Sequence, residues 1–397
     1  MRSVTIIGGG PAGLSAARVL VAAGLRDVLV LERNPEAGGL PRFCDHLGWG
    51  MVDRHRLWRG PRYARELVDR AAGAEIRTNV TVTGLTPGGR VSVTGPDGPA
   101  VIESRAVLIA TGIRETPRGP RLVAGTRPWG VTTTGAFQEM VQAGQVPFRR
   151  PVIIGTELVA FSAIMTARHA GIRPVAMVEA DIRITARRPG DLIARHVFGV
   201  PVLTATRLVE IRGLDRVEEV VVEQDGQRRT IACDGVIFSG AFVPEAFIVA
   251  SSGLTIDPGS GGPAIDNFYR CSDPSYFAAG NILRPVEHSG IAAAEGARAA
   301  TAIAVSLRDG LPSPTIAIPV SVAGAMRYAY PQRLIVEHDS LRLFGRARSA
   351  HKGRLRVLAD GAEIASRPIS VLPERRIALA IRANDLIGRR TVSILLD

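Results

Sequence analysis

The chain has 397 residues, 46% of them hydrophobic and 22% charged, and a formal net charge of +12. This length allows two or three domains with a substantial core, and the many glycines and prolines are typical of a turn-rich α/β protein. No apolar run approaches the roughly 18 residues that a membrane-spanning helix needs, so we expect a soluble, cytoplasmic protein without a transmembrane segment.

Cysteine and lysine usage argues against several kinds of chemistry. The three cysteines, Cys44, Cys233 and Cys271, lie far apart and form neither a CxxC pair nor a metal-ligand cluster. We therefore expect no redox-active CxxC disulfide, no cysteine-ligated iron–sulfur cluster and no zinc site. The single lysine, Lys352, leaves almost no candidate for a Schiff-base mechanism.

The amino-terminal residues predict a phosphate-binding turn. An apolar strand over 4–7 leads into a GxGxxG motif made by Gly8, Gly10 and Gly13, and a helix of small residues follows. In such a turn the first glycine permits the bend, the second lets the backbone approach a pyrophosphate, and the third lets the helix pack on the strand. The helix N-terminus offers free N–H groups and a partial positive charge to the phosphates.

An acidic residue ends this first unit. A second apolar strand, over 28–31, ends at Glu32, about 20 residues after the turn, where a carboxylate can bond ribose hydroxyls. Five stretches share a known fingerprint: GGGPAG, Glu32-Arg33, Gly38-Gly39, 105-RAVLIATGIRETP-117 and 274-PSYFAAGNILRPVEHSGIAAAEGARAA-300. Together they resemble the two-dinucleotide-binding flavoproteins, the superfamily of thioredoxin and glutathione reductases. The resemblance covers about residues 1–310 and implies bound FAD.

The resemblance also implies which residues contact the cofactor. They are Gly8, Gly10, Pro11, Ala12, Gly13, Glu32, Arg33, Gly39, Leu40, Val82, Ala110, Thr111, Gly112, Gly280, Asn281, Ser289, Gly290 and Ile291. Asn281 replaces an aspartate that bonds the ribityl chain in the family, so it keeps the hydrogen-bonding reach but loses the charge. The helix starting near Ser289 is expected to point its N-terminus at the flavin pyrimidine ring, where a positive helix end stabilises the anionic reduced flavin.

The segment after the glycine pair, 38–64, lies near the isoalloxazine ring in this family and supplies candidate catalytic residues. Disulfide reductases carry a CxxxxC here, whereas this chain has only Cys44, which either packs as a small residue or contacts the flavin as a thiolate. His46 and His288 could relay protons to the flavin, or could be loop histidines that bond the backbone. Three arginines could clamp an anionic substrate or remain solvated: Arg42, Arg54 and Arg114.

Residues 151–180 repeat the first unit at an offset of 147 residues. The first glycine and the terminal acid of the repeat are Gly155 and Glu179, but Glu157 replaces the second glycine and Ala160 the third. A carboxylate in the place of a pyrophosphate costs roughly 4 kcal/mol, or about three decades in affinity, so we doubt NAD(P) binding. Alternatively, Glu157 could point away from the turn and interact with the helix dipole, which would leave NAD(P) binding intact.

The repeat predicts an α/β protein with two Rossmann-like domains, the second inserted in the first. An FAD domain is expected at 1–119 and 244–310, with an NAD(P)-type domain at 120–243 inserted in it. A linker at 311–331 and a carboxy-terminal β domain at 332–397 are expected to follow. The last part shows period-two alternation and an Asp360-Gly361 hairpin signal, which predict a small antiparallel β domain.

The carboxy-terminal part is also strongly basic. Residues 331–397 hold thirteen basic and seven acidic side chains, and this excess favours docking onto an acidic partner subunit. Nucleic acid is not expected, because no aromatic stacking pattern or binding motif accompanies the charge. The domain is therefore expected to bind a protein.

More closely, the motif GG-x-P-x-x-C-x-H at 38–46 and the 279-AGN-281 turn resemble one subgroup of the superfamily. These are the FAD subunits of multi-component dehydrogenases of the hydrogen cyanide synthase, opine oxidase, and amino-acid or glycerol-3-phosphate dehydrogenase type. Larger relatives end in a cysteine-rich iron–sulfur module, which this chain lacks. The resemblance implies an FAD-dependent oxidoreductase that works with a partner subunit on a small amino acid, opine or hydroxy compound. The alternatives are a stand-alone NAD(P)H-dependent acceptor reductase and a non-catalytic scaffold subunit with structural FAD.

Overall fold

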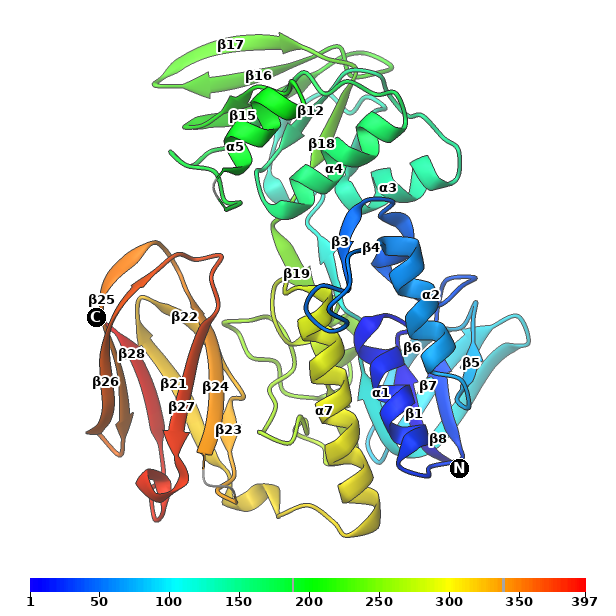
Figure 1. The fold of residues 1–397 in the computed structure, drawn as a ribbon, viewed down its shortest axis with the longest axis vertical. Helices are drawn as coiled ribbons and strands as arrows, with labels where there is room; N and C mark the ends of the chain where they lie inside the picture. The colour runs from blue at the N-terminus through cyan, green and yellow to red at the C-terminus, as the bar shows by residue number, and fades with distance from the viewer. Residues whose placement is uncertain (188, 338–339) are drawn as a thin grey trace.

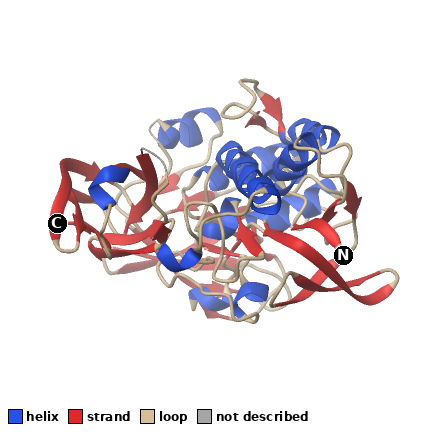
Figure 2. Ribbon diagram, turned by 90° about the horizontal axis from the view of Figure 1, so that it is seen from below, coloured by secondary structure: helices blue, strands red, loops and turns tan. Residues whose placement is uncertain are grey.

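The computed structural model of the protein describes residues 1–187, 189–337 and 340–397. Figure 1 shows three parts: an amino-terminal α/β domain that includes the long helix α7, a second α/β domain, and a carboxy-terminal β domain. Figure 2 shows the helices grouped with the two α/β domains, while the carboxy-terminal part consists mainly of strands.

The first domain is a mostly parallel sheet covered by helices. Its strand order is β5-β2-β1-β8-β7-β6, and β20 pairs with β8 on the parallel side. The strands are β1 (Arg2–Ile7), β2 (Val28–Leu31), β5 (Glu75–Arg77), β6 (Thr81–Thr86), β7 (Arg90–Gly95), β8 (Gly98–Ile109) and β20 (Tyr276–Ala278). The helices are α1 (Pro11–Ala22), α2 (Gly60–Arg70), α6 (Phe247–Ala250) and α7 (Ser289–Arg308). Two short antiparallel strands, β3 (Leu47–Trp49) and β4 (Trp58–Arg59), form a separate small sheet. Short helical turns are η1 (Leu40–Phe43) and η4 (Gly280–Leu283).

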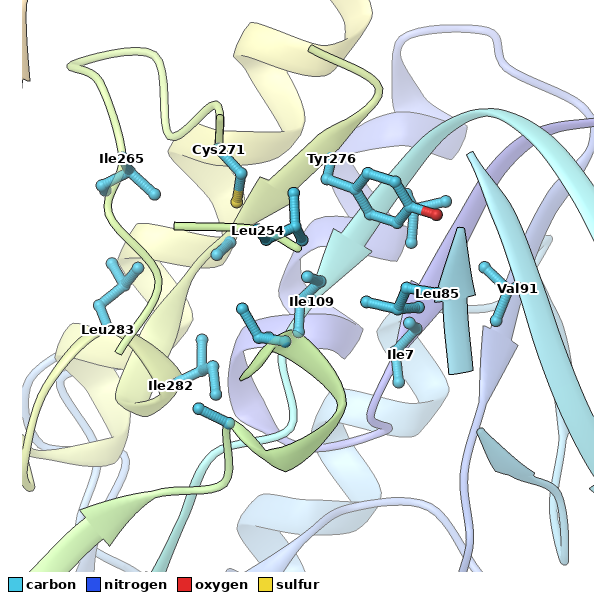
Figure 3. Close-up of a cluster of buried hydrophobic side chains, with 14 of the residues drawn as sticks. Ile7, Leu85, Val91, Ile109, Leu254, Ile265, Cys271, Tyr276, Ile282 and Leu283 are labelled. Carbon is cyan, nitrogen blue, oxygen red and sulfur yellow. The ribbon is translucent and has the colours of Figure 1, made fainter. Parts of the chain in front are cut away.

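Small and apolar residues explain how this domain packs. Val4 and Ile6 of β1 are fully buried, and α1 lies so close to α7 that a Cβ added to Gly296 would collide with the backbone of Ala12. One side of the sheet covers a large apolar cluster that includes Ile7, Ile109 and Cys271 (Figure 3). Cys271 is therefore a core residue.

The second domain is inserted between β8 and β20 of the first. Its five strands are all parallel in the order β11-β18-β12-β13-β14, and a four-stranded sheet lies beside them in the order β10-β15-β16-β17. The strands of the parallel sheet are β11 (Val131–Thr133), β12 (Pro151–Ile154), β13 (Ala176–Val178), β14 (Val202–Leu203) and β18 (Gly235–Phe238). The other strands are β10 (Ala124–Gly125), β15 (Thr206–Arg212), β16 (Glu219–Gln224) and β17 (Gln227–Ala232). The helices are α3 (Thr134–Gln142), α4 (Leu158–His169), α5 (Gly190–Leu192) and the turns η2 (Gly119–Arg121) and η3 (Ile193–Val197).

Two antiparallel strands join the α/β domains, β9 (Ile113–Glu115) and β19 (Phe242–Pro244). The chain thus leaves and re-enters the first domain at one place. This arrangement confirms the predicted fold class of two Rossmann-like units, one inserted in the other.

The carboxy-terminal domain packs two sheets, in the orders β23-β21-β28-β25-β26 and β22-β24-β27, which are antiparallel except for the β21–β28 pair. Its elements are β21 (Ile318–Gly324), β22 (Met326–Tyr330), β23 (Arg333–Leu334), β24 (Ser340–Ala347), β25 (His351–Ala359), β26 (Ala362–Val371), β27 (Ile377–Arg382) and β28 (Val392–Leu396), with the turns η5 (Pro314–Ile316) and η6 (Ala383–Leu386). Asp360 and Gly361 both have positive φ and form the predicted two-residue hairpin turn. Strands β21 and β22 lie inside 311–331 and pair with other strands of the β domain. Most of this stretch is therefore part of the β domain and not the expected linker.

A buried ionic cluster attaches this β domain to the first domain. Arg284 is fully buried, lies 2.8 Å from Glu295 of α7 and places its guanidinium 4.9 Å from the ring centre of Tyr330 on β22. A second ion pair, 3.0 Å long, joins Arg346 of β24 to Glu287. The β domain is therefore packed firmly against α7.

Candidate functional site

The first cradle, residues 8–13, has the geometry of a pyrophosphate-binding turn. Gly8 has φ +107°, and a Cβ added to it would lie 2.5 Å from the carbonyl oxygen of Ala110. A Cβ on Gly13 would collide with the carbonyl of Gly8, so this glycine lets α1 approach β1. Gly10 caps α1, which begins at Pro11, and faces open space, since its added Cβ would meet only Gly39 at 3.9 Å. Gly8 and Gly13 thus make the turn and the close helix approach that the sequence predicts, and Gly10 leaves the turn open.

Glu32 lies at the end of β2 beside this turn. Its Oε2 accepts a hydrogen bond from the Gly9 amide at 3.0 Å, and its Oε1 accepts one from Asn34 at 2.9 Å. The side chain is 6% exposed and therefore held in one direction. Arg33 and Leu40, which are also predicted to contact the cofactor, are exposed.

Segments distant in the sequence complete the site. Gly280, with φ +81°, lies against α1, since its added Cβ would be 2.7 Å from the Cβ of Ala12. Thr111, which with Ala110 and Gly112 follows β8, donates a hydrogen bond from its hydroxyl to the backbone carbonyl of Glu245 at 2.8 Å. Asn281 is not free: its amide donates to the Glu287 carbonyl at 3.2 Å and accepts from the Glu287 amide at 3.0 Å. Val82 packs against the apolar cluster of Figure 3.

The amino-terminal end of α7 is capped by His288. Its Nδ1 accepts a hydrogen bond from the Gly290 amide at 3.2 Å, and burial lowers the pKa of the ring. Ser289 and Ile291, which follow it, are partly exposed. His288 is therefore a neutral helix cap in this structure, and only its Nε2 is left for the predicted proton relay.

Cys44 and His46 belong to a hydrogen-bonded chain between the two α/β domains. The Cys44 thiol donates to Gln138 at 3.4 Å, and the Gln138 amide donates to the Ser162 hydroxyl at 2.6 Å. His46 lies with Nε2 2.5 Å from Ser162 Oγ and Nδ1 2.9 Å from the Leu47 carbonyl. Because a carbonyl only accepts, Nδ1 carries the proton and Nε2 accepts from Ser162. Sequence reasoning missed Gln138 and Ser162, since nothing in their local pattern indicates contact with this loop.

Cys44 is expected to be unreactive in the native protein. Burial raises the pKa of its thiol to about 12, so roughly one thiol in ten thousand is ionised near pH 8. We expect iodoacetamide to modify Cys44 far more slowly in the folded than in the denatured protein, and the Cys44→Ser variant to keep its flavin spectrum. Rapid alkylation, or loss of a long-wavelength charge-transfer band in Cys44→Ser, would instead support the thiolate role.

His46 is expected to make stability depend on pH. Burial lowers its pKa below the ordinary value of about 6.5, so the unfolded chain binds more protons than the folded one in mild acid. Its contribution is present above about pH 6.5 and is lost as the pH falls towards the lowered native pKa. Urea unfolding followed from about pH 7.5 to about pH 5.5 should show a smaller loss of stability in His46→Gln than in the wild type. Equal losses would contradict this assignment.

The three arginines considered as anion clamps each lie beside a different carboxylate of the chain. Arg42 pairs with Glu36 at 2.8 Å, Arg54 lies 3.9 Å from Asp53, and Arg114 lies 3.4 Å from Glu245. Each already has a carboxylate of the chain as its neighbour. The structure therefore does not favour a shared anion-binding role.

The second cradle, residues 155–160, keeps the turn but is filled by its own side chain. Gly155 has φ +113°, close to the value at Gly8. A Cβ on Gly155 would lie 2.6 Å from Glu157 Oε2, and one on Gly240 would collide with Glu157 Oε1. The carboxylate thus folds back into the turn between these glycines and does not point away from it. Burial raises its pKa.

Glu179, the acid of the second cradle that corresponds to Glu32, already accepts hydrogen bonds from neighbouring residues. The Thr156 hydroxyl donates to Glu179 Oε2, the Thr185 hydroxyl lies 3.4 Å from the same oxygen, and the Asp181 amide donates to Oε1 at 3.1 Å. Thr156 takes the place of Gly9 in the first cradle. Arg121 donates to the carbonyls of Ser239 and Gly240 at 2.9 and 2.8 Å beside Glu157. Sequence reasoning missed the contact of Thr156 with Glu179 and that of Arg121 with the turn beside Glu157. The presence of Thr156 at the position of Gly9 was a readable signal for the first of these contacts.

The paired Rossmann units and the open glycine turn define a flavoprotein of the two-dinucleotide-binding class. The chain belongs to the pyridine nucleotide-disulphide oxidoreductase family, which matches residues 2–301. Membership confirms the prediction of an FAD-dependent oxidoreductase, and the first cradle, which Gly10 leaves open, fits FAD. No helix in the described ranges is long and apolar enough to cross a membrane.

Individual proteins resemble most of this chain. An opine oxidase subunit of Rhizobium meliloti is 27% identical over 76% of the chain and 61% of its own length. The NADP(+)-dependent formate dehydrogenase subunit beta of Moorella thermoacetica is 29% identical over 79% of the chain and 45% of its own length. This chain thus spans less than two thirds of either relative. The thioredoxin reductase of T. acidophilum has a similar fold, with a TM-score of 0.65 and 22% identity over 77% of this chain and 98% of its own.

Proposed function

We propose that the chain is the flavoprotein subunit of a multi-component dehydrogenase that oxidises a small amino acid, an opine or a hydroxy compound. The observation that carries this proposal is the contrast between the two cradles: Gly10 faces open space, whereas Glu157 fills the equivalent place. A chain without a usable nicotinamide site and without a CxxC pair must exchange electrons with another group. The relatives named as subunits of opine oxidase and formate dehydrogenase support this proposal.

Bound FAD would supply the electron-accepting chemistry, and the chain's own residues hold and orient it. The amides at the start of α1 and the open face of Gly10 would bind the pyrophosphate, and Glu32 would bond the adenosine ribose. The turn at Gly280 and the N-terminus of α7 would hold the flavin end. We place no chemical step on Cys44, because its thiol is protonated near neutral pH.

The partner subunit is proposed to bind the basic surface of the β domain. Deleting this domain is a poor test, because the deletion would expose the buried Arg284–Glu295 pair. A milder change is the double variant Arg389→Glu/Arg390→Glu, which reverses two exposed charges near the end of the chain. Loss of the co-purified subunit with FAD retained would support docking here, and an unchanged complex would contradict it.

The substrate proposal is tested by the intact complex purified from its own cells. Candidate amino acids, N-substituted amino acids and glycerol 3-phosphate are added without oxygen while flavin absorbance is followed. We expect one class to bleach the flavin in the complex but not in the isolated chain. A complex whose flavin no donor of these classes bleaches, or a chain that co-purifies with no other protein, would contradict the proposal.

A further inference from the structure

A buried carboxylate lies at the N-terminus of α7, the helix expected to face the flavin. In Figure 1 the loop between β3 and β4 lies in front of this end of the helix. Asp53 of this loop has Oδ1 2.9 Å from the position of a Cβ added to Gly290, and Val52 lies as close on the same side. The Asp53 side chain is 8% exposed, and its Oδ1 has no hydrogen-bond partner among the residues that the structure describes.

The surrounding residues fix this carboxylate in place. The Tyr63 hydroxyl of α2 donates to Asp53 Oδ2 at 2.9 Å, and the rings of Tyr63 and Trp49 are 6.1 Å apart. The Arg54 guanidinium lies 3.9 Å from the same carboxylate oxygen. The carboxylate therefore cannot easily turn towards solvent.

An unpaired, buried carboxylate oxygen is unfavourable unless a positive potential faces it. The partial positive charge at the N-terminus of the 20-residue helix α7 supplies such a potential. The other charged or titratable groups nearby are Arg54 on the loop, His288 at the helix cap and Glu287, which is already paired with Arg346 at 3.0 Å. Asp53 and Arg54 thus set opposite charges beside the helix end.

We propose that Asp53 tunes the reduction potential of the bound flavin. Its negative charge partly cancels the positive potential of the α7 N-terminus, and it thereby disfavours the anionic reduced flavin relative to the helix alone. Asp53 acts through the helix end and needs no contact with the cofactor. The inference rests on FAD in the first cradle and is independent of the proposed partner subunit and substrate.

The test measures the flavin midpoint potential of the full-length holoprotein against a reference dye during slow anaerobic reduction. We expect Asp53→Asn to raise the potential, shifting the ratio of reduced to oxidised flavin at least tenfold, or about 30 mV for a two-electron couple. Arg54→Gln should lower the potential, because it removes the neighbouring positive charge. Asp97→Asn makes the same chemical change in an exposed turn and should leave the potential unchanged.

Two outcomes would overturn the inference: an unchanged potential in Asp53→Asn with FAD retained, or a shift in the same direction for Asp53→Asn and Arg54→Gln. If Asp53→Asn loses its flavin, Arg54→Gln decides alone: a lowered potential supports the inference and an unchanged one overturns it. The measurement uses no substrate, nicotinamide or partner, so a failure of the proposed dehydrogenase function leaves its result intact.

Discussion

Replacing Glu157 by glycine is expected to strengthen the binding of NADH or NADPH by at least about a thousandfold. The wild-type carboxylate fills the second cradle between Gly155 and Gly240, and a negative charge near a pyrophosphate costs roughly 4 kcal/mol. Glycine removes the charge and the side chain together, and it restores the residue type of the first cradle. Calorimetric titration of nucleotide into the oxidised holoprotein measures the effect.

The Glu157→Gln variant separates the two contributions. It keeps the volume of the side chain but removes its charge, so we expect an affinity between those of the wild type and Glu157→Gly. In each variant the Thr156 hydroxyl still donates a hydrogen bond to Glu179, and this contact limits the gain in nucleotide affinity. Micromolar binding to the wild type, or equal affinities for all three proteins, would show that Glu157 does not close the site.

Arg284→Met is expected to destabilise the protein by about 3–5 kcal/mol and to weaken FAD retention. The substitution leaves Glu295 buried without its cation, and removing one partner of a buried pair costs this much. It also removes the 2.5 Å hydrogen bond from Arg284 to the carbonyl of Gly280, which packs against Ala12 of the first cradle. Thermal unfolding, followed by the release of flavin fluorescence, reports both effects.

Arg308→Met is the matched control for this prediction. Arg308 pairs with Asp309 at 2.7 Å, but these side chains are 75% and 56% exposed. Such a surface pair contributes less than about 1 kcal/mol. If Arg284→Met melted and released FAD at the same temperature as Arg308→Met, the buried cluster would have no role in holding the cofactor turn.

Local sequence patterns predicted the parts of the fold that depend on short-range geometry. The roles of Gly8 and Gly13 follow from a spacing that requires one turn and one close helix approach. The offset of 147 residues located the second turn at Gly155 for the same reason. The hairpin at Asp360 was readable because two adjacent residues specify its turn.

Contacts between distant segments could not be predicted from such patterns. The direction of the Glu157 side chain depends on Gly240, more than eighty residues later. The link from His46 to Ser162 crosses between domains and has no local signature. Strand β21 lies in the expected linker. Its pairing could not be read locally, because its partner β28 lies near the other end of the β domain.

The most direct test is an anaerobic titration of the purified full-length protein with NADPH, followed by visible absorbance. We expect a yellow protein with one FAD per chain whose flavin band stays unbleached at excess NADPH. A colourless protein would remove the first cradle as the cofactor site. Rapid, stoichiometric bleaching would show that the second cradle still binds nicotinamide despite Glu157.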